Sequence, residues 1–205
     1  MKAGARAVGV AESYGAGDEG TAADASHPDG DDRGSRRTST LAAVVARADR
    51  TVDGFAFGGC TVGGLDATDA VVDLVGRLGR EDVQYVLVSG IAPAWYNVLD
   101  LRAIQRAVDR PLLSVSFEDS PGLEPALREA FEGEALDPRL STYRRQPSRE
   151  RLTVNDETVF VRAVGLDAGE ARDVVRAFTP EGGRPEPIRV ARLAARAADR
   201  WRADS

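Results

Sequence analysis

Apolar positions along the chain gather into short runs that are typical of β-strands. Three runs come early, and the turn at residues 49–53 gives the second and third the spacing of a β-hairpin. Two later runs are continuously apolar, as in the buried central strands of a parallel sheet. The predicted strands are residues 6–10, 41–48, 54–62, 84–88 and 112–117.

Helical periodicity appears between and after these runs. Residues 66–78 place four apolar side chains three and four positions apart, with Asp66 or Thr68 available as the N-terminal cap and Gly79 as the stop. A second helix is predicted between the last two strands. Further helices are expected after Pro121. The predicted helices after the first are residues 94–108, 121–131 and 137–143.

The C-terminal part predicts a hairpin and a final helix. Residues 151–154 and 158–164 read as two strands that flank a turn at Asn155 and Asp156. The final helix is entered through prolines, which suit a helix start, and it carries one apolar stripe. The stripe consists of Val190, Leu193, Ala194, Ala197, Ala198 and Trp201.

The order of these elements predicts an α/β fold with a mixed sheet. Three antiparallel strands, then parallel strands with helices, and an added C-terminal hairpin and helix are closest to a ribonuclease H-like arrangement, with a flavodoxin-like sheet as the runner-up. The 205 residues are expected to form a single domain, 1–205. Residues 15–38 contain no apolar side chain larger than alanine, so we predict a disordered insertion there.

Composition narrows the classes of function. One cysteine and one histidine exclude disulfide scaffolds, zinc fingers and Cys-ligated clusters. No run approaches the roughly 20 apolar residues of a membrane helix, and we expect a soluble, cytoplasmic protein without membrane contact. The net charge of −6 means that nucleic acid would have to bind a local basic patch. The oligomeric state is not indicated.

Candidate catalytic groups follow the central strands, where ligands bind in open α/β sheets. A metal-dependent nuclease needs carboxylates there, because Mg²⁺ prefers hard oxygen ligands. The available acids are Glu12, Asp66 and Asp100. Each has a plainer interpretation: Asp66 as a helix cap, Asp100 as a solvated or locally bonded residue inside the second helix, and Glu12 as a surface residue at a strand end.

Glycines surround the third strand, and their spacing partly resembles a P-loop. Gly63 is followed by Gly64 and Leu65 rather than by the Lys and Ser/Thr that hold phosphates and Mg²⁺, so nucleotide hydrolysis is not expected. A tight turn is the favoured interpretation. The helix that starts near residue 66 could still receive a phosphate at its N-terminus.

Two further segments have residues suited to nucleic acid. Trp95 or Tyr96 could stack on a base and Asn97 could contact a base edge, although aromatic residues at a helix start more often anchor the core. In the last helix, four arginines share the face opposite the apolar stripe and could neutralise phosphates, or could simply be solvated. They are Arg189, Arg192, Arg196 and Arg200.

Three motifs occur in register along the chain: GGLDATDAV at 63–71, VSGIAPAWYNVLDL at 88–101 and GRPEPIRVARLAA at 183–195. Together they resemble the archaeal endonuclease dU family, which is similar to endonuclease V. The resemblance covers nearly the whole chain outside residues 15–38. It implies a ribonuclease H-like fold, a requirement for Mg²⁺ or Mn²⁺, and hydrolysis of a phosphodiester in DNA near a deaminated base such as deoxyuridine.

Several family positions differ in this chain. The resemblance implies acidic residues where Ala11, Gly63 and Ser89 stand, an aspartate where Glu12 stands, and a histidine where Arg192 stands. Losing carboxylates lowers the charge that attracts Mg²⁺ to such a site. The retained residues of the pattern are Asp66, Thr68, Asn97, Asp100, Glu186 and Arg189.

Three hypotheses follow. The first is an endonuclease that acts through Glu12 and Asp66, with Arg189 and Arg192 near the phosphates of DNA. The second is a catalytically silent relative that binds nucleic acid or a protein through the same surface. The third is a small-molecule or nucleotide binder that uses residues 63–68 to hold an anion.

Overall fold

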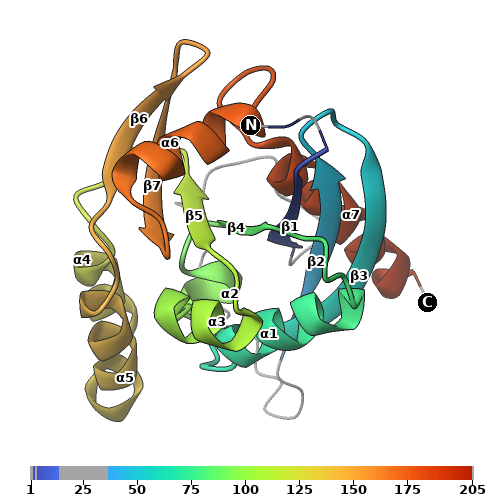
Figure 1. Cartoon of the computed structure of the whole chain (residues 1–205). Helices are drawn as coiled ribbons and strands as arrows, with labels where there is room; N and C mark the ends of the chain where they lie inside the picture. The colour runs from blue at the N-terminus through green and yellow to red at the C-terminus, as the bar shows by residue number, and fades with distance from the viewer. Residues whose placement is uncertain (1, 3, 14–36, 205) are drawn as a thin grey trace.

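A mixed seven-stranded sheet forms the centre of the protein, seen in a computed structural model that describes residue 2 and residues 4–13 and 37–204 (Figure 1). The strands are β1 Arg6–Ser13, β2 Thr38–Arg47, β3 Val52–Thr61, β4 Tyr85–Ser89, β5 Leu112–Ser116, β6 Glu150–Val154 and β7 Glu157–Val164. Their order across the sheet is β3, β2, β1, β4, β5, β7, β6.

Strand directions confirm the predicted ribonuclease H-like fold. Strand β1 pairs antiparallel with β2, which pairs antiparallel with β3, while β4 lies parallel to β1 and β5 parallel to β4. The predicted hairpin β6–β7 is also confirmed, and β7 joins it to the sheet antiparallel to β5. Asn155 and Asp156 both have positive φ, as a two-residue hairpin turn of type I′ requires.

Helices cover both faces of this sheet. The helices are α1 Ala67–Leu78, α2 Pro93–Tyr96, α3 Leu101–Val108, α4 Glu124–Ala130, α5 Gly133–Arg144, α6 Ala168–Ala177 and α7 Glu186–Ala203. Helices α1 and α3 bury side chains against one face, whereas α6 and the start of α7 bury theirs against the other. Helices α4 and α5 form a smaller cluster beside the sheet.

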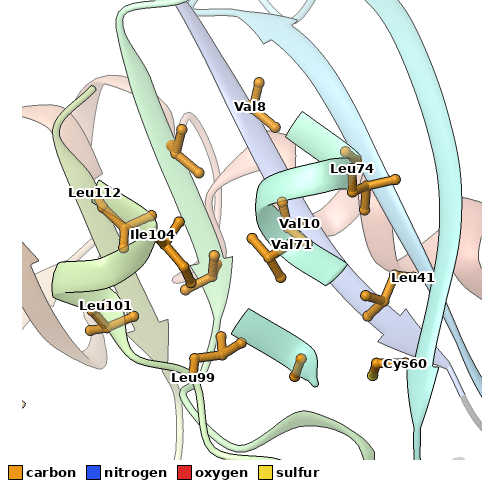
Figure 2. Packing of buried hydrophobic residues seen from close by; sticks show 14 of the residues in the cluster. Val8, Val10, Leu41, Cys60, Val71, Leu74, Leu99, Leu101, Ile104 and Leu112 are labelled. Atoms are coloured by element: carbon orange, nitrogen blue, oxygen red, sulfur yellow. The ribbon is translucent and has the colours of Figure 1, made fainter. Parts of the chain in front are cut away.

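Alternation along the strands creates the two core layers. Val8 and Val10 of β1 face α1, and Ala7 faces the opposite layer. Figure 2 shows the first layer, in which Val71 and Leu74 of α1 lie among branched side chains of the strands. Central strands that are apolar on both sides are therefore explained by helices on both faces.

The predicted insertion at residues 15–38 lies outside the described residues up to residue 36. Its last residue, Thr38, begins β2 and pairs with Thr61, so the strand starts earlier than predicted. β-Branched Thr38 and Thr40 suit this extended segment, and antiparallel pairing on both sides of β2 carries the strand toward its start. Within the described residues no helix is long and apolar enough to cross a membrane.

The prediction of one helix at residues 94–108 was wrong. Three of the four residues of the short α2, Ala94, Trp95 and Tyr96, have positive φ of 49°, 53° and 61° and are therefore not in right-handed helical geometry. The regular helix α3 begins only at Leu101. Asp100 therefore lies at the N-cap of α3 rather than inside a helix, and its side chain accepts a hydrogen bond from Ala103 N–H.

The predicted apolar stripe of the last helix was wrong in part, although its members Val190 and Ala194 do pack against the core. Leu193 and Trp201 are 53% and 71% exposed, whereas the buried line of α7 runs through Ile188, Ala191 and Ala195. The backbone of Pro187 and Ile188 in α7 lies against Gly9 of β1, where a β-carbon would lie only 2.1 Å from the carbonyl carbon of Pro187. Close approach of backbone to backbone, and not side-chain size, selects the face of α7 that packs.

Sequence analysis missed helix α6. Its start carries a capping box, in which Asp167 accepts from Glu170 N–H and the Glu170 carboxylate accepts from Asp167 N–H. Ala171, Val174 and Val175 then provide helical spacing of buried side chains. These signals were present in the sequence.

Gly9→Ala should destabilise the protein by roughly 3 kcal/mol or more, because the added β-carbon separates α7 from β1. Gly76→Ala is the matched control, since a β-carbon at position 76 of α1 meets nothing within 4 Å. The control should be neutral or more stable by about 0.5–1 kcal/mol. Urea unfolding of both variants measures the difference, and equal stabilities would contradict the packing described here.

Candidate functional site

Polar groups gather at the carboxyl ends of β1 and β4, beside the connection from β3 to α1. Glu12 is the next-to-last residue of β1, where it pairs with Leu41 of β2, and it is partly buried. Its Oε2 accepts hydrogen bonds from the Ser39 hydroxyl at 2.9 Å and from Ala94 N–H at 2.6 Å. Burial raises the pKa of Glu12 above its ordinary value, against the lowering effects of these hydrogen bonds and of Arg192.

Glu12 thereby holds a left-handed turn. Three successive residues without the freedom of glycine, Ala94, Trp95 and Tyr96, have positive φ, at a cost of about 1–2 kcal/mol each. Both polar backbone groups of Ala94 are bound: N–H to Glu12, and the carbonyl to Gly63 N–H at 2.7 Å. The strained turn is thus fixed by β1 on one side and by the β3–α1 connection on the other.

Asn97 links the same turn to α1. The side chain is fully buried, and its amide donates to Thr61 O at 2.9 Å and to Asp66 Oδ1 at 2.6 Å. Its carbonyl oxygen accepts from Ala67 N–H at 3.0 Å. Because these contacts use the amide completely and leave no exposed surface, the geometry favours a positioning role over contact with a base edge.

Asp66 stands at the N-cap of α1 but does not cap it. Its carboxylate instead accepts from the N–H and the hydroxyl of Thr61, in addition to the amide of Asn97. Desolvation alone would raise the pKa of Asp66, but the hydrogen bonds from Asn97 and Thr61 outweigh it and lower the pKa below its usual value. The interpretation of Asp66 as a helix cap was wrong, because Asn97 occupies the first free N–H of α1.

Cys60, near the end of β3, is affected by both acids. Burial, followed by the charges of Glu12 and Asp66, raises the pKa of its thiol to about 12. The side chain is 2% exposed, so the thiol is neither ionised at neutral pH nor accessible. Glu12 and Asp66 are linked more directly by the turn at residues 94–97, because Ala94 N–H donates to Glu12 and the Asn97 amide donates to Asp66.

Asp100 has separate partners. Its carboxylate caps α3 and lies 3.6 Å from the guanidinium of Arg145. Across the part of the chain that the structure describes, no three His, Cys, Asp or Glu side chains lie close enough together to hold a metal ion. The predicted set of Glu12, Asp66 and Asp100 therefore does not form a three-ligand centre.

The residues present do not fit a resident Mg²⁺ or Mn²⁺. Such ions need hard oxygen ligands that are free to coordinate, and here Glu12 and Asp66 already accept hydrogen bonds from protein donors. At two positions where the family pattern implies an acidic residue, Gly63 and Ala11, neighbouring residues leave no space for a carboxylate side chain. A β-carbon on Gly63 would lie 2.8 Å from the Trp95 ring, and Ala11 is buried against Ala191 of α7.

Three backbone donors of the suggested anion cradle at residues 63–68 already have protein partners. The N–H groups of Gly63 and Gly64 donate to the carbonyls of Ala94 and Thr61, and Ala67 N–H donates to Asn97. These three donors are therefore not free to contact an anion. The glycines form a turn, as the favoured interpretation proposed.

An arginine that sequence analysis missed holds this turn from outside. Arg139 of α5 is 4% exposed and donates to the carbonyls of Tyr96, Gly63 and Gly64. Its guanidinium also lies 3.9 Å from the centre of the Phe131 ring. Nothing in the pattern around α5 sets Arg139 apart from the neighbouring surface arginines, because its carbonyl partners lie far away in sequence.

The predicted stacking residues form an aromatic cluster beside Arg139. The Trp95 ring lies 4.9 Å from that of Phe131 and 5.8 Å from that of Tyr96, and both Trp95 and Tyr96 are partly buried. This packing agrees with the alternative interpretation, in which aromatic residues at a helix start anchor the core.

The arginines of α7 differ in their surroundings. Arg189 is exposed and donates two hydrogen bonds of 2.7 Å to the Glu186 carboxylate. These hydrogen bonds lower the pKa of Glu186 below its usual value. Arg192 is partly buried on the side of the site, where the negative charge of Glu12 acts on it. Sequence analysis placed both near phosphates, but only Arg192 lacks a carboxylate partner at salt-bridge distance among the described residues.

Comparison with known families and sequences adds independent information. The sequence model described as endonuclease dU matches residues 3–199. A UPF0215 protein from Pyrobaculum calidifontis is 36% identical over 159 residues, which cover 77% of this chain and 86% of the relative. A UPF0215 protein from Thermococcus kodakarensis is 31% identical, with 77% and 80% of the two chains covered.

Solved structures show the same fold. A protein of unknown function from Archaeoglobus fulgidus aligns with a TM-score of 0.74 at 23% identity, covering 95% of this chain and 98% of that one. Endonuclease V from Ciona intestinalis, in complex with DNA containing an inosine, aligns with a TM-score of 0.60 at 12% identity, covering 97% and 87%. Both likenesses confirm the architecture of the sheet and its helices.

Glu12→Gln should remove a dependence of stability on pH. The folded-state pKa of Glu12 is raised above 4.5, so its favourable contribution is present below that pH and is lost as pH rises through the raised pKa. A glutamine carbonyl can still accept from Ser39 and Ala94. We therefore expect the variant to be at least as stable as the wild type at pH 7, and to lose less stability between pH 4.5 and 8.

Thermal unfolding across that pH range measures the effect, with the exposed Glu134→Gln as the control for loss of one charge. A Glu12→Gln variant that is less stable by the same amount at every pH would contradict the buried environment described here.

Asn97→Ala should destabilise the protein by about 2 kcal/mol. The substitution leaves Ala67 N–H without its acceptor and removes a donor from the Asp66 carboxylate. Urea unfolding measures the change in free energy, and a change below about 0.5 kcal/mol would contradict the bridging role of this amide.

Proposed function

This chain belongs to the endonuclease dU family, and on that premise we propose that it binds DNA at the carboxyl ends of β1, β4 and β5 without metal-dependent cleavage of its own. The single observation that carries the proposal is the state of the acids. Glu12, Asp66 and Asp100 are engaged by protein donors, and no three metal-binding side chains meet in the described residues.

Family membership supports DNA as the ligand. Endonuclease V, whose fold this chain shares, is seen in complex with inosine-containing DNA. The basic side chains of α7 lie next to the strand ends, and a DNA-binding surface on an acidic chain must be a local patch of this kind. We extend this to DNA that carries deaminated bases, such as deoxyuridine, because that is the ligand which the family name implies.

A second candidate is hydrolysis of DNA near deoxyuridine with Mg²⁺ or Mn²⁺. One observation favours it: Glu12 and Asp66 both accept hydrogen bonds from the same short turn, Glu12 from Ala94 N–H and Asp66 from the Asn97 amide. In that case the two acids would have to exchange their protein donors for a metal ion when DNA binds.

The two candidates are separated by measuring binding and nicking of one duplex. A labelled duplex with a single deoxyuridine is incubated with the protein in Mg²⁺, in Mn²⁺ and in EDTA. We expect binding that is unchanged by EDTA and weakened by salt, and no nicking under any condition. Asp66→Ala is included as the matched variant.

Metal-dependent nicking that Asp66→Ala abolishes would overturn the binding-only proposal in favour of hydrolysis. Absence of any binding to the duplex, with the protein shown to be folded, would overturn both. Circular dichroism of each variant supplies that check.

A further inference from the structure

Three arginines from two segments meet beside the carboxyl ends of the central strands. Arg192 and Arg196 lie one turn apart on α7, which runs alongside β1 and β2 (Figure 1). Arg184 precedes α7, and its guanidinium lies 4.2 Å from the centre of the Phe117 ring, directly after β5. Phe117 packs against the same core layer as Ile188 of α7, so all three arginines lie on one side of the sheet.

The position of α7 fixes this arrangement. Its first turn lies against Gly9, and farther along Asp199 accepts hydrogen bonds from the hydroxyls of Ser13, at the end of β1, and of Thr40, which pairs with Ser13 on β2. The helix is therefore held at both ends along β1. Arg192 and Arg196 project from the segment between these contacts, next to the strand ends.

None of these three arginines forms a salt bridge within the described protein. No carboxylate lies within salt-bridge distance of Arg184, Arg192 or Arg196 in the described ranges, and their guanidinium groups donate no hydrogen bond there. Glu12 acts on Arg192 only from a longer distance. The nearest acids have other partners: Glu186 pairs with Arg189, Asp199 binds the two hydroxyls, and Glu12 accepts from Ser39 and Ala94.

Partial burial makes this lack of counterions significant. All three side chains are partly buried. Burial, followed by the positive charge of neighbouring arginines, lowers the pKa of Arg184 and of Arg192 below its usual value. Solvated surface arginines gain little from an added anion, but grouped and partly desolvated guanidinium groups gain more. Guanidinium also matches the geometry of phosphate oxygens.

We propose that Arg184, Arg192 and Arg196 form a binding site for one phosphate group, which in the complex is a phosphodiester of the bound DNA. This inference rests on the proposed function and names the part of the surface that holds the backbone of DNA. It also assigns Arg189 a different role, because Glu186 already neutralises it.

The experiment compares two double variants that remove the same charge. Arg192→Gln with Arg196→Gln alters the site, and Arg172→Gln with Arg176→Gln alters exposed arginines of α6. Binding of a labelled duplex is measured across a range of KCl concentrations. We expect the first variant to bind at least about tenfold more weakly and to lower the slope of log K against log [salt] by about 2, and the control to leave both nearly unchanged.

A second arm uses inorganic phosphate as the probe, at constant ionic strength set with KCl. Phosphate should raise the Tm of the wild type and of the α6 control but not of the site variant. A duplex affinity and salt slope that are the same in both double variants would overturn the inference, although the protein would still bind DNA.

The two arms distinguish the sources of the anion. If the wild type fails to bind the duplex, the proposed function fails, and stabilisation by phosphate that requires Arg192 and Arg196 would then show that the site takes a free phosphate. If neither phosphate nor the duplex depends on these arginines, the site itself is refuted.

Discussion

Contact between the backbone of Gly9 and the first turn of α7 determines how the functional face of this protein is built. Because no β-carbon separates the two, α7 packs directly on β1, and Ala191 and Ala195 continue the same close line. A more distant helix would pack through its large apolar side chains and turn its arginines into solvent. Close packing instead brings Arg192 to the end of β1, within the electrostatic influence of Glu12.

The polar groups at the strand ends have two different roles: some hold the backbone in place, and others supply positive charge. Glu12 and Asn97 hold backbone conformations that would be costly alone, and Asp66 completes the bridge from Asn97 to Thr61. Acids at such a position in a metal enzyme are stabilised by the cation, whereas here neutral donors do this. Positive charge is supplied at the same edge by arginine side chains, so the face can attract a polyanion without a bound ion.

Sequence patterns predicted the parts of the fold that depend on local periodicity and turn chemistry. Apolar runs located the strands, and Asn155 with Asp156 located a hairpin turn that needs positive φ. The left-handed turn at Ala94 could not be predicted this way, because its residues have no intrinsic preference for positive φ and are held by Glu12, far away in sequence. The buried face of α7 was missed for the same reason, since Gly9 selects it from the other end of the chain.

The same limit applies to the candidate site, where contacts between segments that are distant in sequence could not be predicted. Sequence analysis found Glu12 and Asp66 because strand ends are where ligands bind, but it could not tell that Glu12 Oε2 and both carboxylate oxygens of Asp66 already accept hydrogen bonds. Arg139 was missed because it acquires its surroundings from another segment.

The burial of Cys60 gives the chain an unusual practical property. Cys60 is the sole cysteine in the sequence, and its side chain is 2% exposed with a thiol pKa raised to about 12, so we expect no reaction with maleimides or iodoacetamides while the protein is folded. A cysteine introduced at any exposed position is therefore the only reactive thiol. Fluorophores and spin labels can be attached site by site to the native background, and the modification of Cys60 itself reports global unfolding.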